Sequence, residues 1–401
     1  MHRARIIDFH LMATRSIITG IDIGTHATRV VVCEQAATPD ALPRIIGTGV
    51  AESKGLRHGY VVDPHEAARS IRAAIAAAEK AAGVPIKSAL LSIGGISLES
   101  MISHGTVMVS RADGEVTQLD VEKAVTESEN ALAGTQNKEI LDTIPLRYRL
   151  DSKEILGRPQ GFKGSKLEVK TFFITSLKQH LADLTSTVEE AGVDVIEIVP
   201  APIAAARIAL TKHQRVAGCV LANIGAETVS IAVFENDAPI SLQVFPIGSI
   251  NITYDISLGL RIPIQDAEKL KMGDYSGTFS RKKLDEIVEA RVSEIFELVE
   301  AHLKKIGKNG LLPAGIILTG GGAGIATIED LARGILKLPS SIALPELPGN
   351  QKATIRDSSW FVAYGLCVHG SQNNSRPSLS NGGNISDMID RIKTWFNQYL
   401  P

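Results

Sequence analysis

A carboxylate that lies near the end of an apolar run, directly before a glycine turn, is the first chemical feature of the sequence. Asp22 belongs to the β-branched segment from Ile17 to Ile23, and the turn that follows contains Gly24, Thr25 and His26. A tight turn between two strands exposes successive backbone N–H groups, which can bind an anion. A carboxylate at the end of a strand suits a hydrated Mg²⁺ ion. The motif alone is also typical of an ordinary hairpin.

The same pattern occurs a second time, 201 residues later in the chain. The segment ANIGAETVSIAVFE aligns without a gap on IDIGTHATRVVVCE, so that Asn223 matches Asp22. The second turn contains Gly225, Ala226, Glu227 and Thr228. This offset is half of the 401-residue chain, which predicts two homologous halves. Two such turns facing each other across a cleft would hold the phosphates of one nucleotide. The alternative is a coincidence between two generic hairpins.

Two other groups of residues could contact a ligand. Gly320, Gly321 and Gly322 follow a buried apolar strand and precede a helix. A backbone without side chains can approach a flat ligand closely, although a tight strand–helix turn is the alternative. Glu268 and Lys271 are three residues apart and therefore share one face of a short helix. Their spacing alone favours a solvent-exposed ion pair.

The composition is that of a globular protein and argues against a nucleic-acid partner. Hydrophobic residues make up 44% of the chain, charged residues 21%, and the net charge is −2, which leaves no basic footprint. Cys33, Cys219 and Cys367 have no metal or redox spacing. Two of them fall in expected strands and one in an expected helix, which predicts buried, reduced thiols and a cytoplasmic protein.

No apolar run approaches the ~20 residues that a membrane-spanning helix needs. Residues 1–11 lack the apolar stretch of a signal peptide. Met12 could be the true start, and we expect residues 1–13 to be a disordered extension.

Strand and helix signals alternate along most of the chain, which predicts an α/β fold. Asp63 before Pro64 is a strong helix start, and Gly83 ends the Ala-rich helix that follows. Between Ser88 and Thr175 the pattern changes to four strands and one helix, which predicts a small α+β domain inserted into the first half. A small-residue helix after Pro200 belongs again to the larger domain.

The C-terminal segment has the pattern of a flexible linker followed by an amphipathic helix. Residues 371–383 are rich in Ser, Asn and Gly, and residues 384–401 place apolar side chains at helical spacing along one stripe. The stripe consists of Ile385, Met388, Ile389, Ile392, Trp395, Phe396 and Leu400. Aromatic residues on such a stripe are typical of a helix that lies in a membrane interface. A helix folded back onto the core is the alternative, but the long linker argues against it.

The order of these motifs resembles the actin-like ATPase superfamily over essentially the whole chain. The matching features are DIGT, the small-residue helix after Pro200, the second DIG-like turn, AEKLK, LTGGGA and a final AYGL helix. The insertion, with Ile144-Pro145 and GRPQGFKGSKLEV, is similar to the FtsA family of bacterial cell division, as are LRHGYVVDP and the terminal helix. The resemblance implies an α/β, actin-like two-domain fold with an inserted α+β subdomain (1C) and a C-terminal amphipathic helix.

The resemblance also implies subdomain boundaries. Subdomain 1A would comprise residues 14–87, 179–215 and 345–370, subdomain 1C residues 88–178, subdomain 2A residues 216–252 and 312–344, and subdomain 2B residues 253–311. Residues 371–383 would form the linker and residues 384–401 the membrane-targeting helix.

The family gives each matching position an expected role in binding ATP and Mg²⁺. Asp22 would face the metal, and Gly24, Thr25 and His26 would surround the phosphates. The second phosphate loop would contain Asn223, Gly225, Ala226, Glu227 and Thr228. Glu268 and Lys271 would contact the ribose and adenine region. The adenosine would lie against Gly320, Gly321 and Gly322.

The chain departs from the family pattern at both turns. The second loop usually begins with Asp and continues with three glycines, whereas this chain has Asn223 and Glu227 there. The Lys that often follows the first DIGT is absent, since Ala27 and Thr28 follow His26. We therefore expect nucleotide binding with little or no hydrolysis.

The resemblance implies a protein that polymerises head to tail and tethers FtsZ filaments to the inner face of the cytoplasmic membrane at the division site. Its expected partners are FtsZ, further copies of itself, membrane lipid and other divisome proteins. FtsZ would bind subdomain 2B. Two alternatives stay open: a PilM-like adaptor of pilus assembly, and an ATP-dependent enzyme of the same superfamily, for which no carboxylate base can be identified.

Overall fold

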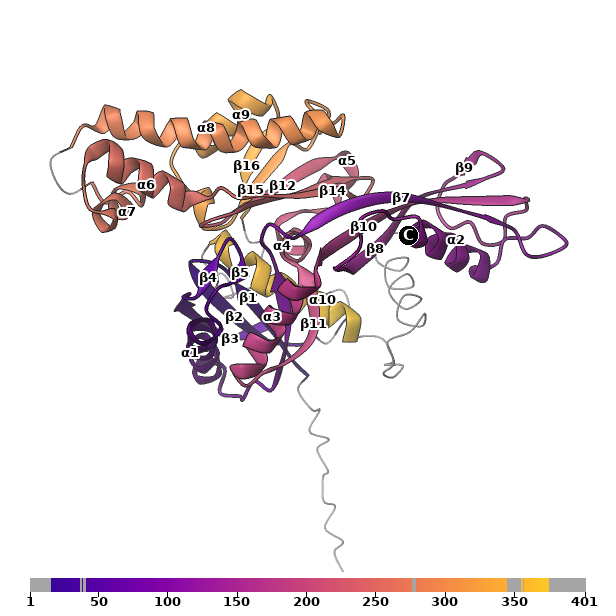
Figure 1. Cartoon of the computed structure of the whole chain (residues 1–401), viewed down its shortest axis with the longest axis horizontal. Helices are drawn as coiled ribbons and strands as arrows, with labels where there is room; N and C mark the ends of the chain where they lie inside the picture. Colours follow the sequence, from indigo (N-terminus) through magenta and orange to yellow (C-terminus); the bar gives the residue numbers. More distant parts are fainter. Residues whose placement is uncertain are drawn as a thin grey trace, which may run out of the picture.

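The computed structural model describes residues 16–36, 38, 41–275, 279–344, 355 and 357–374. Within these residues two halves each contain a five-stranded sheet, and a smaller sheet extends to one side (Figure 1). The first sheet has the order β11-β6-β1-β2-β3. Its strands are β1 (Ile17–Ile23), β2 (Ala27–Glu34), β3 (Arg44–Glu52), β6 (Ser88–Ile93) and β11 (Asp194–Pro200).

The second sheet has the equivalent order, β14-β13-β12-β15-β16. Its strands are β12 (Cys219–Ile224), β13 (Val229–Glu235), β14 (Ala238–Phe245), β15 (Ile316–Thr319) and β16 (Ser340–Ile342). In both sheets three consecutive strands are antiparallel, and two later strands join in parallel beside the first of them. The shared order confirms the two homologous halves that the internal repeat predicts.

The repeat extends to single residue pairs. Asp22 pairs with Arg29 in the β1–β2 hairpin, and Asn223 pairs with Ser230 in the β12–β13 hairpin. Both pairs are related by the same offset of 201 residues. The two glycine turns therefore occupy equivalent positions in the two sheets.

Four helices pack around the first sheet: α1 (Pro64–Ala82), α3 (Lys178–Glu190), α4 (Ala201–Ala209) and α10 (Phe361–Asn374). A Cβ added at Gly365 would lie 2.0 Å from the carbonyl oxygen of Ala204, so α10 and α4 are in backbone contact there. The buried Tyr364 hydroxyl donates to the carbonyl of Pro43 at 3.0 Å. The small residues Gly365 and Ala204 therefore allow the two helices to pack closely.

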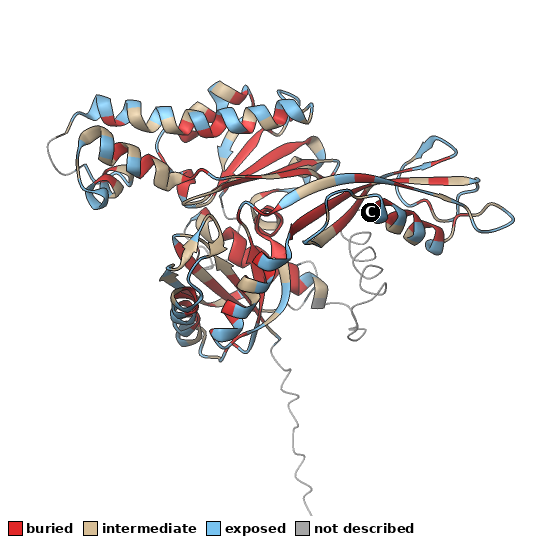
Figure 2. Ribbon diagram, viewed as in Figure 1, coloured by how far each residue is buried: buried red, intermediate tan, exposed pale blue. Residues whose placement is uncertain are grey.

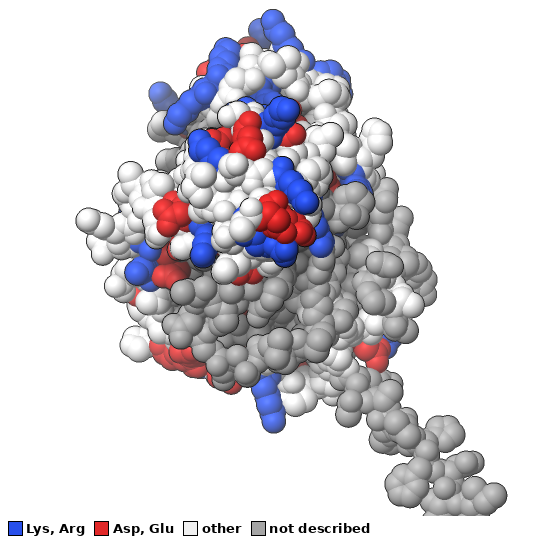
Figure 3. All heavy atoms as spheres, turned by 90° about the vertical axis from the view of Figure 1, so that its right-hand side faces the viewer, with Lys and Arg blue, Asp and Glu red and all other residues white. Residues whose placement is uncertain are grey.

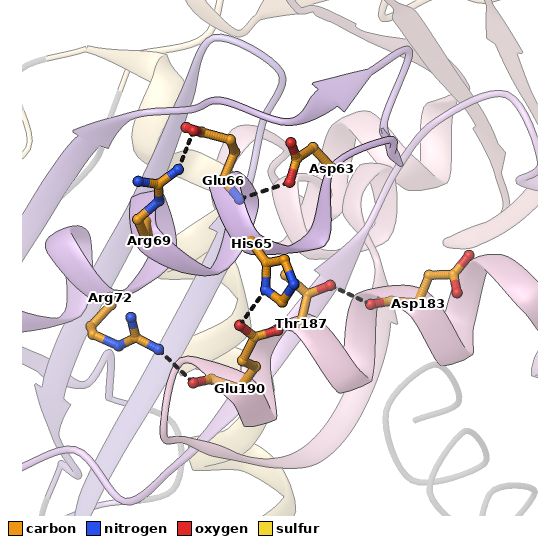
Figure 4. Close-up of polar contacts among 8 residues, drawn as sticks. All are labelled: Asp63, His65, Glu66, Arg69, Arg72, Asp183, Thr187 and Glu190. Carbon is orange, nitrogen blue, oxygen red and sulfur yellow. Dashed lines mark hydrogen bonds and ion pairs between the residues drawn. The ribbon is translucent and has the colours of Figure 1, made fainter.

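Helix α1 begins and ends where its local signals predict. Asp63 caps the first turn, and Gly83 ends the helix with φ at 69°. Glu190 of α3 joins the two helices (Figure 4). His65 Nδ1 lies 3.0 Å from its carboxylate, and Arg72 donates to its main-chain carbonyl at 2.6 Å.

The helices of the second half are α5 (Lys212–Ala217), α6 (Ser249–Leu260), α7 (Ile264–Lys271), α8 (Arg281–Lys305) and α9 (Ile328–Leu336). Helix α6 packs on α7 and α8, and α8 also packs on α9. Helices α6 and α7 and the first part of α8 extend away from the sheet as an arm (Figure 1). The end of α8 lies on the sheet, where His302 Nε2 is 2.7 Å from the hydroxyl of Ser241 in β14. Two short 3₁₀ segments, Gly321–Gly324 and Ser358–Trp360, follow β15 and precede α10.

The inserted domain has a sheet of the order β7-β10-β8-β9. Its elements are β7 (Glu99–Met108), α2 (Gln118–Asn130), β8 (Lys138–Leu150), β9 (Lys153–Ile155) and β10 (Lys166–Leu177). Helix α2 packs against β7 and β10, so the domain is α+β as predicted. Strand β8 begins at Lys138, and its first residues pair with the end of β10. The short β9 and the hairpin of β4 (Leu56–Arg57) and β5 (Tyr60–Val61) were not predicted.

Charges on the inserted domain are balanced locally. Figure 3 views the molecule from the side of this domain and shows basic and acidic side chains interspersed. Arg111 pairs with Asp113 at 2.7 Å, and Arg147 pairs with Glu154 at 3.2 Å. Such pairs keep this face from carrying a field of one sign.

Buried side chains concentrate in the sheets and on the helix faces toward them (Figure 2). One apolar cluster runs from the first sheet into the inserted domain and onto one face of the second sheet, and a second cluster lies between the other face of the second sheet and helices α6 to α9. Cys33, Cys219 and Cys367 are buried free thiols, as predicted.

The linker predicted at residues 371–383 is wrong for residues 371–374, because these continue α10 and Ser371 is buried against the first half. The rest of that linker, the expected extension at residues 1–13 and the amphipathic helix at residues 384–401 lie outside the described residues. None of the helices that the structure describes is both long and apolar enough to cross a bilayer.

Candidate functional site

The first turn follows a carboxylate, Asp22, whose position is fixed by a hydrogen bond from a neighbouring strand. Asp22 lies at the end of β1 and accepts a hydrogen bond from Ser92 Oγ of the neighbouring β6 at 2.7 Å. Burial raises the pKa of Asp22, while the Ser92 hydrogen bond and the positive charge of Arg29 oppose this rise. Gly24, Thr25 and His26 form the turn between β1 and β2, directly after this carboxylate.

The second turn has the same form but a different polar residue at its base. Gly225 N donates to the carbonyl of Thr228 at 2.9 Å and closes the turn that contains Ala226 and Glu227. Asn223 stands where the first half has its carboxylate, so this side carries an amide instead of a negative charge. The two halves therefore offer one charged and one neutral oxygen donor.

The three glycines after β15 have different roles. Gly320 has φ at +88°, and a Cβ there would lie 2.3 Å from Asn223 Oδ1. A Cβ at Gly322 would lie 2.4 Å from a methyl group of Ile224. Both positions must be glycine because the backbone packs on the end of β12. A Cβ at Gly321 would meet no atom of the described residues within 4 Å, so among these three glycines it is the one that adjoins space where a ligand could lie.

Glu268 and Lys271 of α7 form a 2.8 Å ion pair, and the Lys271 side chain is only 7% exposed. The solvent-exposed pair favoured by spacing alone is therefore wrong for Lys271, because α6 covers it. Lys271 Nζ donates to the hydroxyl of Thr253 at 2.9 Å and to the carbonyl of Ser249 at 3.2 Å. The Thr253 hydroxyl donates to Glu268 at 2.6 Å.

Helix α6 connects this pair to the second turn. Its first residue, Ser249, donates its backbone N–H to the carbonyl of Gly225 at 2.9 Å, and Ile250 donates to Ala226 at the same distance. The N-terminus of α6 is thus packed onto the turn. A shift of the turn would be transmitted directly to the helix that holds the Lys271 side chain.

The electrostatics of Glu268 connect the two halves. Burial opposes its ionisation, but hydrogen bonds from Lys271 and Thr253 outweigh this, and the pKa of Glu268 is lowered. The positive charge of Lys271 acts in the same direction, and His26 of the first turn is close enough across the two halves to contribute as well.

A direct contact also crosses between the halves. Glu227 of the second turn accepts a hydrogen bond from the backbone N–H of His58 at 2.5 Å, and His58 Nδ1 lies 3.2 Å from the Glu227 carbonyl. His58 belongs to the turn between β4 and β5 and has φ at 49°. The Glu227 carboxylate is thus held on the first half, at the side of the candidate phosphate site.

The β4–β5 turn continues this contact to the inserted domain. His180 Nε2 donates to the carbonyl of Gly59 at 2.9 Å, and its Nδ1 lies 2.6 Å from the hydroxyl of Ser97. Ser97 in turn lies 2.8 Å from Ser176 at the end of β10. His180 also stacks on Tyr60 with ring centroids 4.4 Å apart, and burial lowers its pKa. A continuous polar path therefore runs from the second turn to the base of the inserted domain.

The residues fit a nucleotide with a hydrated Mg²⁺ ion. One carboxylate, completed by water and phosphate oxygens, is a common way of holding Mg²⁺, and Asp22 supplies it. The two turns supply backbone N–H donors for phosphate. Gly321 leaves room for the nucleoside.

Sequence reasoning missed four residues that define this geometry: Ser92, Arg29, His58 and Thr253. Ser92 could have been found, since it is a polar residue inside a buried strand that pairs in parallel with β1. Arg29 could also have been found, since it lies opposite Asp22 in the expected hairpin. His58 and Thr253 depend on tertiary contacts that no local pattern reveals.

Comparisons with known proteins agree with this arrangement. The family model described as "Cell division protein FtsA" matches residues 220–365, and the model described as "SHS2 domain inserted in FTSA" matches residues 95–175. The cell division protein FtsA of Bacillus subtilis (strain 168) is 33% identical over 377 residues, which cover 88% of this chain and 83% of that protein. The cell division protein FtsA of Pseudomonas aeruginosa is 31% identical over 409 residues, covering 94% and 97%.

Solved structures show the same fold. The structure of the PilM-PilN type IV pilus biogenesis complex has a TM-score of 0.65 at 18% identity and covers 89% of this chain and 99% of that chain. MreB5 of Spiroplasma citri bound to ADP has a TM-score of 0.52 at 15% identity, covering 91% and 99%. These likenesses support the actin-like two-domain fold and say nothing of activity. From its inserted domain and its identity to these relatives, the chain belongs to the FtsA family of cell division proteins.

Proposed function

We propose that the chain binds ATP and Mg²⁺ in the cleft between its two glycine turns. The observation that carries this proposal is the pair of equivalent turns, with a held carboxylate at Asp22 and open space beside Gly321. A structure of the same fold, MreB5 of Spiroplasma citri, is described as bound to ADP. Bound Mg²⁺ would neutralise phosphate charge.

Hydrolysis is expected to be weak or absent. Asn223 cannot take a proton from an attacking water, because an amide is not a base at neutral pH. Glu227, the carboxylate of the second turn, is tied to His58 on the opposite half. Nucleotide binding would then control the assembly of the protein into filaments, and the bound ATP would not serve as the substrate of a catalytic reaction. We propose head-to-tail polymerisation of the actin-like body on this basis.

We propose that FtsZ binds the arm formed by α6 and α7. An open groove of about 370 Å³ lies there, lined by Tyr254, Ser257, Leu258, Arg261, Ile262 and Ile264. Leu258 is 81% exposed and Ile264 is 50% exposed, which is unusual for apolar side chains without a partner. Arg261 would add a charge contact to an acidic peptide.

We further propose that residues 384–401 tether the assembly to the cytoplasmic face of the inner membrane at the division site. Membrane insertion of the apolar stripe would supply most of the affinity, since the segment has only two basic residues, Arg391 and Lys393. One such helix binds weakly. Polymerisation would raise the effective affinity by presenting many helices at once.

Liposome co-sedimentation with ATP tests the tether. We would compare the full chain, a truncation after Gly383, Trp395→Glu, and Asn397→Glu as a matched control that adds the same charge to the polar face. The full chain and Asn397→Glu should pellet with lipid, while the truncation and Trp395→Glu should stay in solution. If all four behave alike, the membrane tether is refuted and an adaptor of the PilM kind becomes the better proposal.

The FtsZ proposal is tested in the same assay. Leu258→Asp should abolish recruitment of FtsZ to the liposomes and leave lipid binding of the variant intact. Recruitment at the level of the unmodified chain would place the FtsZ site elsewhere.

A further inference from the structure

Arg29 lies beside the candidate phosphate site and forms no ion pair within the described part of the chain. It is directly opposite Asp22 in the antiparallel β1–β2 pair, so both side chains are on the same face of the sheet. Its positive charge acts on the Asp22 carboxyl group. Because side chains alternate along a strand, position 27 is on this face as well. Ala27, whose methyl group is buried, stands there.

The Arg29 guanidinium group has a buried N–H group that lacks a hydrogen-bond acceptor among the described residues. Its Nε is buried and donates to no acceptor in the part of the chain that the structure describes. The guanidinium carbon lies 5.7 Å from the ring centroid of Trp360, a contact that holds the charge without an anion. Buried N–H groups are almost always paired in folded proteins, and a charged one is costly to leave unpaired. Such a group is ready to accept an anion.

We propose that Arg29 is a phosphate-binding residue of the nucleotide site, and that it replaces the Lys often found at position 27 in the family. This inference rests on the proposed nucleotide binding. The guanidinium group would leave the Trp360 ring and donate to phosphate oxygens held by the first turn. Its planar pair of N–H groups suits a phosphate better than a single ammonium group does.

Trp360 supplies a direct readout. The chain has two tryptophans, so Trp395→Phe leaves Trp360 as its single tryptophan. We would titrate this full-length protein with ATP, ADP and adenosine and follow Trp360 fluorescence. Departure of the cation from the ring should change the emission with ATP and ADP. Adenosine, which has no phosphate, should bind without this change.

Variants at position 29 decide the assignment. Arg29→Ala should weaken ATP and ADP binding about tenfold to hundredfold, the range for loss of a charged hydrogen bond, and leave adenosine affinity unchanged. Arg29→Lys should retain part of the affinity, and Ala27→Lys combined with Arg29→Ala should regain part of it. Arg44→Ala is the matched control, since Arg44 is an exposed arginine of β3 that pairs with Glu34.

Each contrary result has a distinct meaning. If the unmodified chain binds ATP and Arg29→Ala binds it equally well, the Arg29 assignment is wrong while nucleotide binding stands. If Arg29→Ala loses adenosine together with ATP, its role is structural and the assignment is also wrong. If the unmodified chain binds neither ATP nor adenosine, the proposed nucleotide site fails and Arg29 with it. Circular dichroism of each variant separates loss of binding from loss of folding.

Discussion

Replacing Glu227 with Gln should tighten ATP binding. The Glu227 carboxylate belongs to the second turn, is 22% exposed, and accepts a hydrogen bond from the backbone of His58. A nucleotide held between both turns would bring its terminal phosphate close to this negative charge. Gln keeps an oxygen that accepts the His58 hydrogen bond but removes the charge. The substitution therefore isolates electrostatic repulsion from the contact between the halves.

The expected size follows from Coulomb's law. Two unit charges about 6 Å apart repel by about 1.4–2.8 kcal/mol at an effective dielectric constant of about 20 to 40. Because the Glu227 side chain is partly exposed, screening favours the lower value. About 1.4 kcal/mol corresponds to a tenfold change in affinity. We expect the Kd for ATP to fall about tenfold, the Kd for ADP to fall less, and the Kd for adenosine to stay unchanged.

Isothermal titration calorimetry of the full chain measures these three affinities. The control is Glu235→Gln, which removes the same charge at the far end of β13, where Glu235 pairs with Lys308. The control should bind ATP like the unmodified chain, and the gain in Glu227→Gln should shrink as salt is raised. If Glu227→Gln binds ATP no tighter, or tightens adenosine equally, repulsion by Glu227 is not what limits affinity.

Three further predictions concern stability and hydrolysis. The pKa of the buried His180 is lowered from 6.5, so the unfolded chain binds a proton more readily, and stability should fall as pH drops below about 6.5. The Tm of His180→Gln should depend less steeply on pH in this range. An equally steep dependence would exclude His180 as the source of the pH effect. Gly365→Ala should lower stability by about 1–3 kcal/mol or more, because its Cβ would lie 2.0 Å from a backbone oxygen. Gly334→Ala in open space on α9 is its control, and equal effects would contradict the clash. Asn223→Asp should raise the rate of phosphate release from ATP at least about tenfold, because it restores a carboxylate near the attacking water. An unchanged rate would show that Asn223 is not the cause of weak hydrolysis.

The sequence predicts best those features whose cause is local. The bounds of α1 follow from the cap at Asp63 and the left-handed Gly83, and both are short-range signals. The two hairpins follow from apolar runs that flank a glycine turn. Their equivalence follows from the repeat, because residues such as Asp22 and Asn223 keep the same register in both sheets.

Features that depend on distant segments could not be predicted in this way. The exposure expected for Lys271 is wrong because α6, which supplies Thr253, covers it. The contact of Glu227 with His58 joins residues 169 positions apart. The glycines at 320 and 322 suggest a ligand by their number, yet both are required by packing on the end of β12. Only the folded structure shows whether a glycine is needed for ligand binding or for packing.

The position of α10 has a consequence for biosynthesis. The first half contains the earliest strands, but its core also requires α10, which packs on β1, β2, β6 and α4. The Cys367 thiol, for example, donates to the carbonyl of Val31 at 3.3 Å. The second half is built from a nearly continuous stretch of chain, and the apolar cluster between its sheet and helices α6 to α9 contains no residue of α10.

Proteins generally fold N-terminal domains first during synthesis, but the first half of this chain cannot complete its core until residues 361–374 have emerged from the ribosome. Residues 384–401 emerge after α10 and residues 375–383. The segment proposed to bind the membrane therefore emerges from the ribosome only after the last helix that the core of the first half requires.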